Sequence, residues 1–248
     1  MAGTAVLGRL TWLVAEVAET VTETPHVRTL TLDVPGWAGH RAGQHVDVRL
    51  TADDGYQAER SYSLASAPGD SPALTVERLE DGEVSPYLVD EAAPGDRFEL
   101  RGPIGGYFVW DGDGGEAPLM LIAGGSGVVP FMSMLRHRHG LRSNVPTRLL
   151  YSSRTPDDVI YRDELDALAT SDDGLEVVYT FTRESPPGWT GYARRVDIDL
   201  LRDVAFPPQQ DSRMYVCGPT SFVEAVADNL VALGHRPGRI RTERFGGA

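Results

Sequence analysis

The sequence predicts two domains of different class, an N-terminal antiparallel β-barrel followed by an α/β domain with a parallel sheet. Residues 9 to about 109 form short alternating stretches separated by Gly, Pro and Asp, which is typical of a closed antiparallel barrel. Beyond residue 118, apolar strands alternate with helical segments, which indicates parallel βαβ units and a nucleotide-binding sheet. A Gly- and Asp-rich segment over 110–118 separates the two patterns. We therefore predict domains at 1–112 and 113–248.

The barrel half of the chain carries several strand signals and one helix signal. Alternation of polar and apolar residues predicts the strands, which lie at 27–34, 45–50, 60–64, 74–79 and 97–100. One helix is expected at 85–90, because Ser85 is a suitable N-cap and Pro86 suits the first helical position.

The α/β half opens with a continuous apolar run at 119–123, which predicts a strand covered on both faces. Helical patterning follows over 130–139. Further strands are expected at 148–152, 176–181, 214–217 and 240–245, and further helices at 161–168 and 221–233.

The composition favours a folded, acidic protein. The 248 residues are 41% hydrophobic, which is enough apolar material for real cores, and they carry a formal net charge of −13. That charge argues against non-specific binding to nucleic acids or anionic membranes. The chain has neither a run of about 18 apolar residues nor the charged-then-apolar start of a signal peptide. We therefore expect a cytoplasmic protein.

Residue usage limits the metal and redox chemistry within this chain. The single cysteine, Cys217, excludes an intrachain disulfide and a four-cysteine iron–sulfur or zinc site. His137 and His139 are two apart on a predicted helix, and the other four histidines, His45 among them, lack spaced partners, so we predict no metal site. Lysine is absent, so all 23 basic residues are arginine, and every cationic contact to a phosphate must come from one.

The stretch at 60–64, Arg-Ser-Tyr-Ser-Leu, is the first of five ordered motifs. Strand alternation places Arg60 and Tyr62 on one face and the two serines on the other, a pattern that an exposed barrel strand would share. Four motifs follow, namely 82–85 (Gly-Glu-Val-Ser), 102–105 (Gly-Pro-Ile-Gly), 124–130 (Gly-Gly-Ser-Gly-Val-Val-Pro) and 217–219 (Cys-Gly-Pro). The set resembles the ferredoxin–NADP reductase superfamily over nearly the whole chain. The resemblance implies a stand-alone FAD and NAD(P)H reductase without a fused iron–sulfur or globin domain.

By this resemblance the barrel is the flavin domain. Arg60 would pair with a flavin phosphate, Tyr62 would lie against the isoalloxazine ring, and Ser63 would hydrogen-bond near its reactive nitrogen. An arginine fork suits a phosphate, and an aromatic face suits a planar ring system. A surface ion pair with Glu59 or Asp54 is the alternative for Arg60.

The motif at 82–85 bears on which flavin is bound. A glycine turn that leads into a helix offers backbone N–H groups and the positive end of the helix dipole to an anion. By resemblance, Gly82, Val84 and Ser85, together with Leu64 of the stretch at 60–64, would hold FAD, whose pyrophosphate distinguishes it from FMN. An ordinary capped helix would have the same sequence.

The motif at 124–130 follows a buried strand and opens a helix, so its glycines would let a pyrophosphate approach backbone amides. By resemblance, a nicotinamide dinucleotide would be held by Gly125, Gly127, Pro130, Cys217, Gly218 and Pro219. Cys217 would then lie near the hydride path, and an inert buried thiol is the alternative.

Hydride transfer requires mainly that two rings are stacked at near-attack distance. Ser63, Cys217 and Glu243 are the residues expected to line that contact. Glu243 is included because a C-terminal Glu-x-aromatic pattern resembles the end of the family's sequences. Phe245 would then shield or approach the flavin ring.

The sequence favours NADPH over NADH. Preference for NADPH requires hydroxyls and arginines near the phosphate on the adenosine ribose, beyond the strand ends that follow the glycine turn. The candidates there are Ser153, Arg154, Thr182 and Arg183, with Arg194 and Arg195 within reach. No acidic residue replaces Thr182, where an acid would repel the phosphate. The alternative is that these arginines are solvated loop charges.

Together the motifs predict a flavin-dependent oxidoreductase that takes hydride from NAD(P)H to FAD and passes electrons to a separate acceptor, a ferredoxin or an oxygenase-type partner. The implied cofactors are FAD and NADP, or NAD. One alternative is a non-catalytic electron-relay subunit of a larger redox complex. Another is a binding module that kept the fold and lost the chemistry, against which the presence of Ser63, the glycine turn and Cys217 argues.

Overall fold

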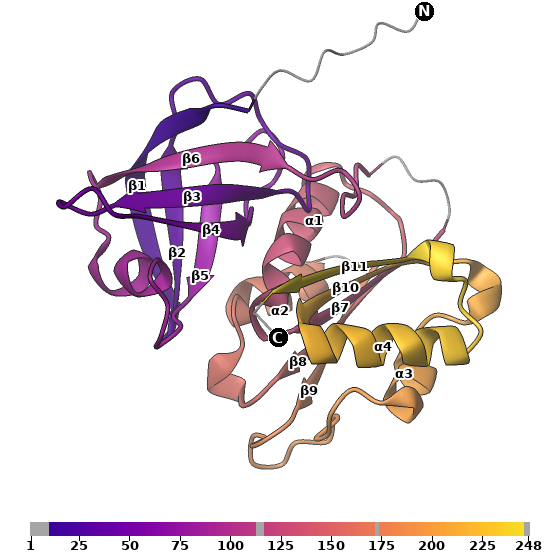
Figure 1. The fold of residues 1–248 in the computed structure, drawn as a ribbon. Helices are drawn as coiled ribbons and strands as arrows, with labels where there is room; N and C mark the ends of the chain where they lie inside the picture. The colour runs from indigo at the N-terminus through magenta and orange to yellow at the C-terminus, as the bar shows by residue number, and fades with distance from the viewer. Residues whose placement is uncertain (1–9, 113–116, 172–173, 246–248) are drawn as a thin grey trace, which may run out of the picture.

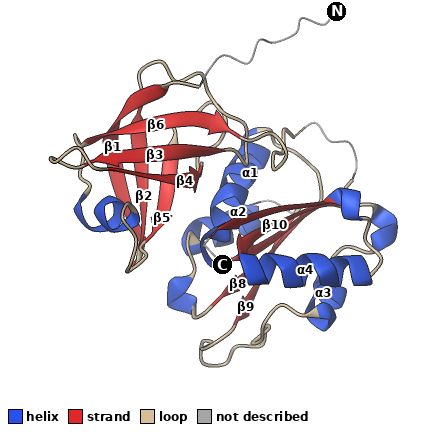
Figure 2. Cartoon of the chain, viewed as in Figure 1, coloured by secondary structure: helices blue, strands red, loops and turns tan. Residues whose placement is uncertain are grey.

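The computed structural model describes residues 10–112, 117–171 and 174–245, and it has two domains side by side (Figure 1). Six antiparallel strands form the first domain, and a five-stranded parallel sheet with helices on both faces forms the second (Figure 2). The predicted fold class is confirmed. The predicted boundary after residue 112 adjoins residues 113–116, which lie outside the described residues, so its position stays a prediction.

The barrel strands follow the order β4-β3-β6-β1-β2-β5. Their bounds are β1 Trp12–Thr24, β2 Val27–Asp33, β3 His45–Thr51, β4 Gln57–Ser63, β5 Ala73–Glu77 and β6 Arg97–Ile104. The two edge strands β4 and β5 meet through an isolated bridge between Leu64 and Leu74. Alternating apolar residues of these strands fill the interior, among them Leu30, Val46, Val48 and Leu100, which are fully buried.

The short helix of the barrel differs from the prediction in its first turn. It is a π-helical segment, Tyr87–Glu91, and Pro86 rather than Ser85 is its N-cap residue. The Ser85 hydroxyl instead accepts a hydrogen bond from the backbone N–H of Leu79 (3.1 Å). The prediction that Ser85 caps the helix is therefore wrong, because its hydroxyl accepts from a backbone N–H of the preceding turn and not from the first turn of the helix.

The second domain is a parallel sheet in the order β11-β10-β7-β8-β9. Its strands are β7 Leu119–Gly124, β8 Thr147–Ser153, β9 Leu175–Phe181, β10 Arg213–Pro219 and β11 Ile240–Phe245, and its α-helices are α1 Val129–Gly140, α2 Arg162–Ser171, α3 Ile198–Val204 and α4 Thr220–Ala232. Short 3₁₀ turns occur at Gly125–Val128, Pro156–Asp158, Pro208–Gln210 and Pro237–Arg239. No helix among the described residues is long and apolar enough to cross a membrane.

Both faces of this sheet are covered. Every residue of β7 is buried, which confirms the prediction from its continuous apolar run. Helices α1 and α2 pack on the face toward the barrel, whereas α3 and α4 pack on the other (Figure 1). Helix α3 was not predicted, although Asp197 caps it by accepting a hydrogen bond from the N–H of Leu200 (2.9 Å).

A buried relay of hydroxyl groups joins the two domains. Tyr161, which precedes α2, donates to the hydroxyl of Thr75 on β5. The Thr75 and Thr29 hydroxyls are 2.7 Å apart, and Thr29 donates to Glu23 on β1 (2.7 Å). Tyr161 has a φ of 60°, the left-handed region that side chains other than glycine seldom adopt, so the interface holds it against a local preference.

Removal of the Tyr161 hydroxyl tests this relay. We expect Tyr161→Phe to lower the free energy of unfolding by about 1 kcal/mol, because one buried hydrogen bond contributes about that much net stability. The substitution keeps the aromatic ring and its packing. Thermal unfolding of the purified protein should show a midpoint lower by a few degrees. Tyr192→Phe, at a half-buried tyrosine outside the relay, is the control. An equal midpoint for Tyr161→Phe and wild type would contradict the assigned role.

Candidate functional site

The glycine turn, residues 124–127, packs directly against the carboxyl end of β10. A Cβ atom on Gly127 would lie 2.2 Å from the Cys217 carbonyl oxygen, so only glycine fits there. Gly218 and Gly124 face each other under Phe222, with 3.3 Å from a Cβ on Gly218 to the Gly124 Cα atom. The two predicted nicotinamide motifs therefore lie side by side.

The outer side of the same turn is open. Gly125 has a φ of 56°, and a Cβ atom built on it would meet no atom within 4 Å. Pro130 is buried in the first turn of α1, where a missing backbone N–H has no cost. Ser126 donates to Glu77 Oε2 of β5 (2.7 Å), which ties the turn to the barrel.

The side chain of Arg60, on strand β4, extends toward the 82–85 motif. The Arg60 guanidinium contacts Glu83 Oε2 (2.5 Å) and the Glu59 carbonyl oxygen (2.7 Å). The Arg60 ion pair is thus with Glu83, and not with Glu59 or Asp54 side chains. Tyr62 is half-buried against the barrel core, and burial raises its pKa to about 12.

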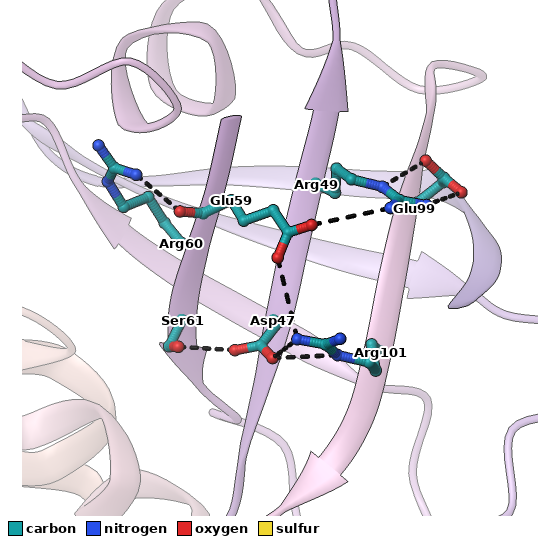
Figure 3. Close-up of polar contacts among 7 residues, drawn as sticks. All are labelled: Asp47, Arg49, Glu59, Arg60, Ser61, Glu99 and Arg101. Atoms are coloured by element: carbon teal, nitrogen blue, oxygen red, sulfur yellow. Dashed lines mark hydrogen bonds and ion pairs between the residues drawn. The ribbon is translucent and has the colours of Figure 1, made fainter. Parts of the chain in front are cut away.

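The other face of β4 belongs to a network of charged groups on the outside of the barrel (Figure 3). Ser61 donates to Asp47 (2.7 Å), and Arg101 donates to the same carboxylate (2.7 Å). Glu59 lies 3.7 Å from Arg49 and 3.8 Å from Arg101. Ser61 therefore faces away from Arg60 and Tyr62, as strand alternation predicts.

Several residues predicted to bind the flavin have side chains that pack or hydrogen-bond within the barrel. Leu64 and Val84 are fully buried in its core, so their side chains pack within the domain. The Gly82 N–H donates to the Leu79 carbonyl oxygen (3.0 Å), and the Ser85 hydroxyl is used by the same turn. Backbone groups around Glu83 are what this segment offers to a ligand.

The three residues predicted to line the hydride contact converge where the two domains meet. Ser63 pairs across the strands with His45 of β3, and His45 Nδ1 lies 3.7 Å from Glu243 Oε1 of β11. Glu243 in turn pairs in register with Cys217 of β10. Strands from both domains thus bring together His45 and Glu243, which lie 198 positions apart in the sequence.

Burial controls the protonation of this cluster. It raises the pKa of Glu243 to about 7, and the buried Glu243 Oε2 atom has no hydrogen-bond partner among the described residues. Burial also raises the pKa of Cys217, and the neighbouring Glu243 adds to that effect. Burial lowers the pKa of His45, although Asp47 acts against this. Cys217 is therefore a protonated, buried thiol in the wall of the site.

The residues predicted to contact the ribose phosphate are adjacent at the ends of β8 and β9. Thr182 donates through its N–H to the Ser153 carbonyl oxygen (3.0 Å), and the Arg183 N–H donates to the Arg154 carbonyl oxygen (2.9 Å). Within the described residues, the guanidinium groups of Arg154 and Arg183 have no ion pair or hydrogen bond, and both side chains are exposed. Arg194, by contrast, is paired with Asp197.

Phe245 and Pro219 end their strands in register, so the C-terminal aromatic ring lies beside the Cys-Gly-Pro turn. Phe245 is 37% exposed, which leaves its ring available for contact. Two observations show that these residues fit the implied cofactors. The backbone at Gly125 is open to a pyrophosphate, and the buried Oε2 atom of Glu243 has no hydrogen-bond partner among the described residues.

Comparison with known proteins agrees with this geometry. Residues 14–109 match the oxidoreductase FAD-binding domain, and residues 121–228 match the oxidoreductase NAD-binding domain. A ferredoxin–NADP reductase from Sorangium cellulosum is 37% identical over 75% of this chain and 77% of its own length. The chain belongs to the ferredoxin–NADP reductase family. Within this family of flavoprotein reductases, the first domain binds FAD and the second binds a nicotinamide dinucleotide.

Two other relatives extend the comparison. The reductase subunit of a glycine betaine monooxygenase from Chromohalobacter salexigens is 32% identical over 91% of this chain. The chain spans only 62% of that relative's length. The crystal structure of a cytochrome P450 reductase from Amycolatopsis matches with a TM-score of 0.83 at 27% identity, covering 98% of this chain and 73% of that one.

Sequence reasoning missed three residues that the structure places at the site. His45 has no spaced partner in the sequence, yet it faces Glu243 across the domain junction. Glu77 and Glu83 contact Ser126 and Arg60, residues of two predicted motifs. Glu83 lies inside the 82–85 motif, so the sequence contains a signal for it. The contacts of His45 and Glu77 depend on how the domains pack, and the sequence contains no signal for them.

The raised pKa of Glu243 predicts a pH-dependent cost of folding. The folded-state pKa of about 7 exceeds the ordinary value of 4.5, so the folded protein binds this proton more tightly than the unfolded chain does. That stabilisation is complete below pH 4.5 and is lost as the pH rises through 7. Relative to wild type, we expect Glu243→Gln to be equally stable near pH 4.5 and more stable, by up to about 3 kcal/mol, above pH 7.

Thermal unfolding of both proteins between pH 4.5 and 8.5 measures this difference, with Glu80→Gln as the control because Glu80 is an exposed loop carboxylate. A stability gap between wild type and Glu243→Gln that does not change with pH would show that the Glu243 carboxyl group titrates normally.

Proposed function

We propose that this reductase transfers electrons from NAD(P)H through FAD to a separate, oxygenase-type redox partner. The observation that carries the proposal is the convergence of Ser63, Cys217 and Glu243 at the junction of a flavin domain and a nicotinamide domain. Bound FAD would supply the redox chemistry, because it accepts hydride and releases electrons singly.

The chain's own residues would orient the two rings and manage one proton. The Ser63 hydroxyl lies on the strand whose Tyr62 ring offers a flat surface. The buried Cys217 excludes water from the nicotinamide side. Glu243, whose pKa is near 7, is able to hold a proton on Oε2 at neutral pH.

The names of the relatives support an oxygenase-type partner. The glycine betaine monooxygenase relative is a reductase subunit, and the solved structure is a cytochrome P450 reductase. Both names describe proteins that serve an oxygenase. In this chain the single cysteine excludes a four-cysteine cluster of its own, so electrons would leave the flavin for a group carried outside these 248 residues.

The test is an absorption spectrum of the purified protein followed by anaerobic addition of NADPH or NADH. We expect a yellow protein that releases FAD and not FMN on denaturation, and whose flavin absorbance is bleached by the nicotinamide. Ser63→Ala should retain FAD but be reduced more slowly in stopped-flow measurements, because a hydrogen bond at the ring is lost while the phosphate anchor remains.

Electron transfer onward is measured with a one-electron acceptor, such as ferricyanide, and then with purified ferredoxins. A colourless protein that FAD fails to reconstitute would refute the proposal. Reduction by saturating nicotinamide at an unchanged rate in Ser63→Ala would refute the role given to that hydroxyl.

We further propose that NADPH is preferred. Arg154 and Arg183 are adjacent at the strand ends, and their guanidinium groups are unpaired among the described residues. Thr182 lies beside them, with its hydroxyl donating to the Ser153 carbonyl oxygen (3.3 Å). Arg195 is a third exposed arginine, in the segment that bridges to Thr180 of β9 through Tyr192. A dianionic phosphate is a better partner for such unpaired cations than a neutral ribose hydroxyl.

The ratio of kcat/KM for NADPH over that for NADH should therefore exceed one in wild type. We expect Arg183→Ala to lower that ratio roughly ten- to a hundredfold, the loss of one charge-assisted hydrogen bond. Arg202→Ala is the control, because Arg202 is paired with Asp199 on α3. A wild-type ratio below one, or a ratio indifferent to Arg183, would contradict the preference.

A further inference from the structure

The ion pair between Arg60 and Glu83 joins the two segments that are expected to hold the flavin phosphates. Arg60 extends from the edge strand β4, and Glu83 lies in the loop between β5 and the short helix. One guanidinium nitrogen of Arg60 is 2.5 Å from Glu83 Oε2. The arginine that would bind a phosphate therefore already has an anionic partner within the chain.

The carboxylate of Glu83 is held from a second side. Its Oε1 atom accepts a hydrogen bond from the Tyr56 hydroxyl (2.5 Å). The hydrogen bond from Tyr56, and then that from Arg60, lowers the pKa of Glu83. Glu83 is consequently a carboxylate at neutral pH, with one oxygen on each donor, and it keeps Arg60 oriented toward the 82–85 motif.

This pair lies in solvent, so it is readily exchanged. The Arg60 and Glu83 side chains are 53% and 45% exposed, and exposed ion pairs are weak and screened by salt. A phosphate offers the same guanidinium more oxygen atoms and more charge than a carboxylate. A phosphate that approaches Arg60 would displace Glu83 and would remain close to its negative charge.

We propose that Glu83 competes with the flavin phosphate for Arg60, so that FAD binds by replacing one anion with another and Glu83 sets the affinity. The inference rests on the proposed function, because it takes Arg60 as the phosphate anchor. A carboxylate at this position weakens flavin binding and at the same time keeps the anchor in place before the flavin arrives.

The experiment is a titration of the flavin-stripped, full-length chain with FAD, followed by quenching of flavin fluorescence. We expect Glu83→Gln to bind FAD roughly three- to tenfold more tightly than wild type at low salt, with the gain shrinking as salt is added. Glu80→Gln removes a charge from the same loop and is the matched control, with no expected change.

Two further variants separate competition for Arg60 from simple repulsion of the phosphate. Glu83→Asp keeps the negative charge but is one methylene too short for the 2.5 Å contact with Arg60. Competition for Arg60 therefore predicts that this variant binds FAD more tightly than wild type, whereas simple repulsion predicts an unchanged affinity. In an Arg60→Ala background, competition predicts that Glu83→Gln no longer tightens FAD binding.

An unchanged affinity in Glu83→Gln, an unchanged affinity in Glu83→Asp, or equal tightening with and without Arg60 would each overturn the inference. Wild-type protein that binds no FAD would instead overturn the proposed function. The two failures are therefore distinguishable in the same titration.

Discussion

The close packing of the glycine turn on the end of β10 is the constraint on which the site depends. Gly127 lies against the backbone of Cys217, and Gly124 lies against Gly218. Because backbones meet there without side chains between them, the ends of the central strand β7 and its neighbour β10 are held together. That contact leaves the Gly125 side of the turn open, and it packs the backbone of Cys217 against Gly127.

The barrel completes the site from the other side. Ser126 of the turn donates to Glu77, Arg136 donates to the Ala65 carbonyl oxygen (2.8 Å), and Tyr161 donates to Thr75. These buried or half-buried contacts have directional geometry, so they fix how the domains meet and not only that they meet. Burial of Glu243 follows from that orientation, and with it the raised pKa that suits a group holding a proton at neutral pH.

The arginines show how an acidic protein with no lysine keeps selected cations available. Most arginines of the described residues are engaged, as Arg49 is with Glu99 and Arg101 is with Asp47. Arg154 and Arg183 are exceptions, and both lie at strand ends where a ribose phosphate is expected. Arg60 is intermediate, since its partner Glu83 is exposed and exchangeable. Pairing thus suppresses non-specific anion binding over most of the surface while a few arginines remain open to phosphates.

The sequence alone determined the two-domain architecture, most strands and helices, and the order of the motifs, because periodicity, glycine turns and apolar runs are local properties of the chain. It also named Ser63, which ends β4, Cys217, which lies in β10, and Glu243, which lies in β11, as the residues expected to line the hydride contact. What those residues contact depends on how the chain folds in three dimensions. Ser85 binds Leu79 instead of capping a helix, His45 faces Glu243, and Glu83 engages Arg60. The last two contacts span domains or loops distant in sequence, and the first depends on the fold of the turn before the helix. No local pattern encodes such partners, because they are set by how whole elements pack against one another.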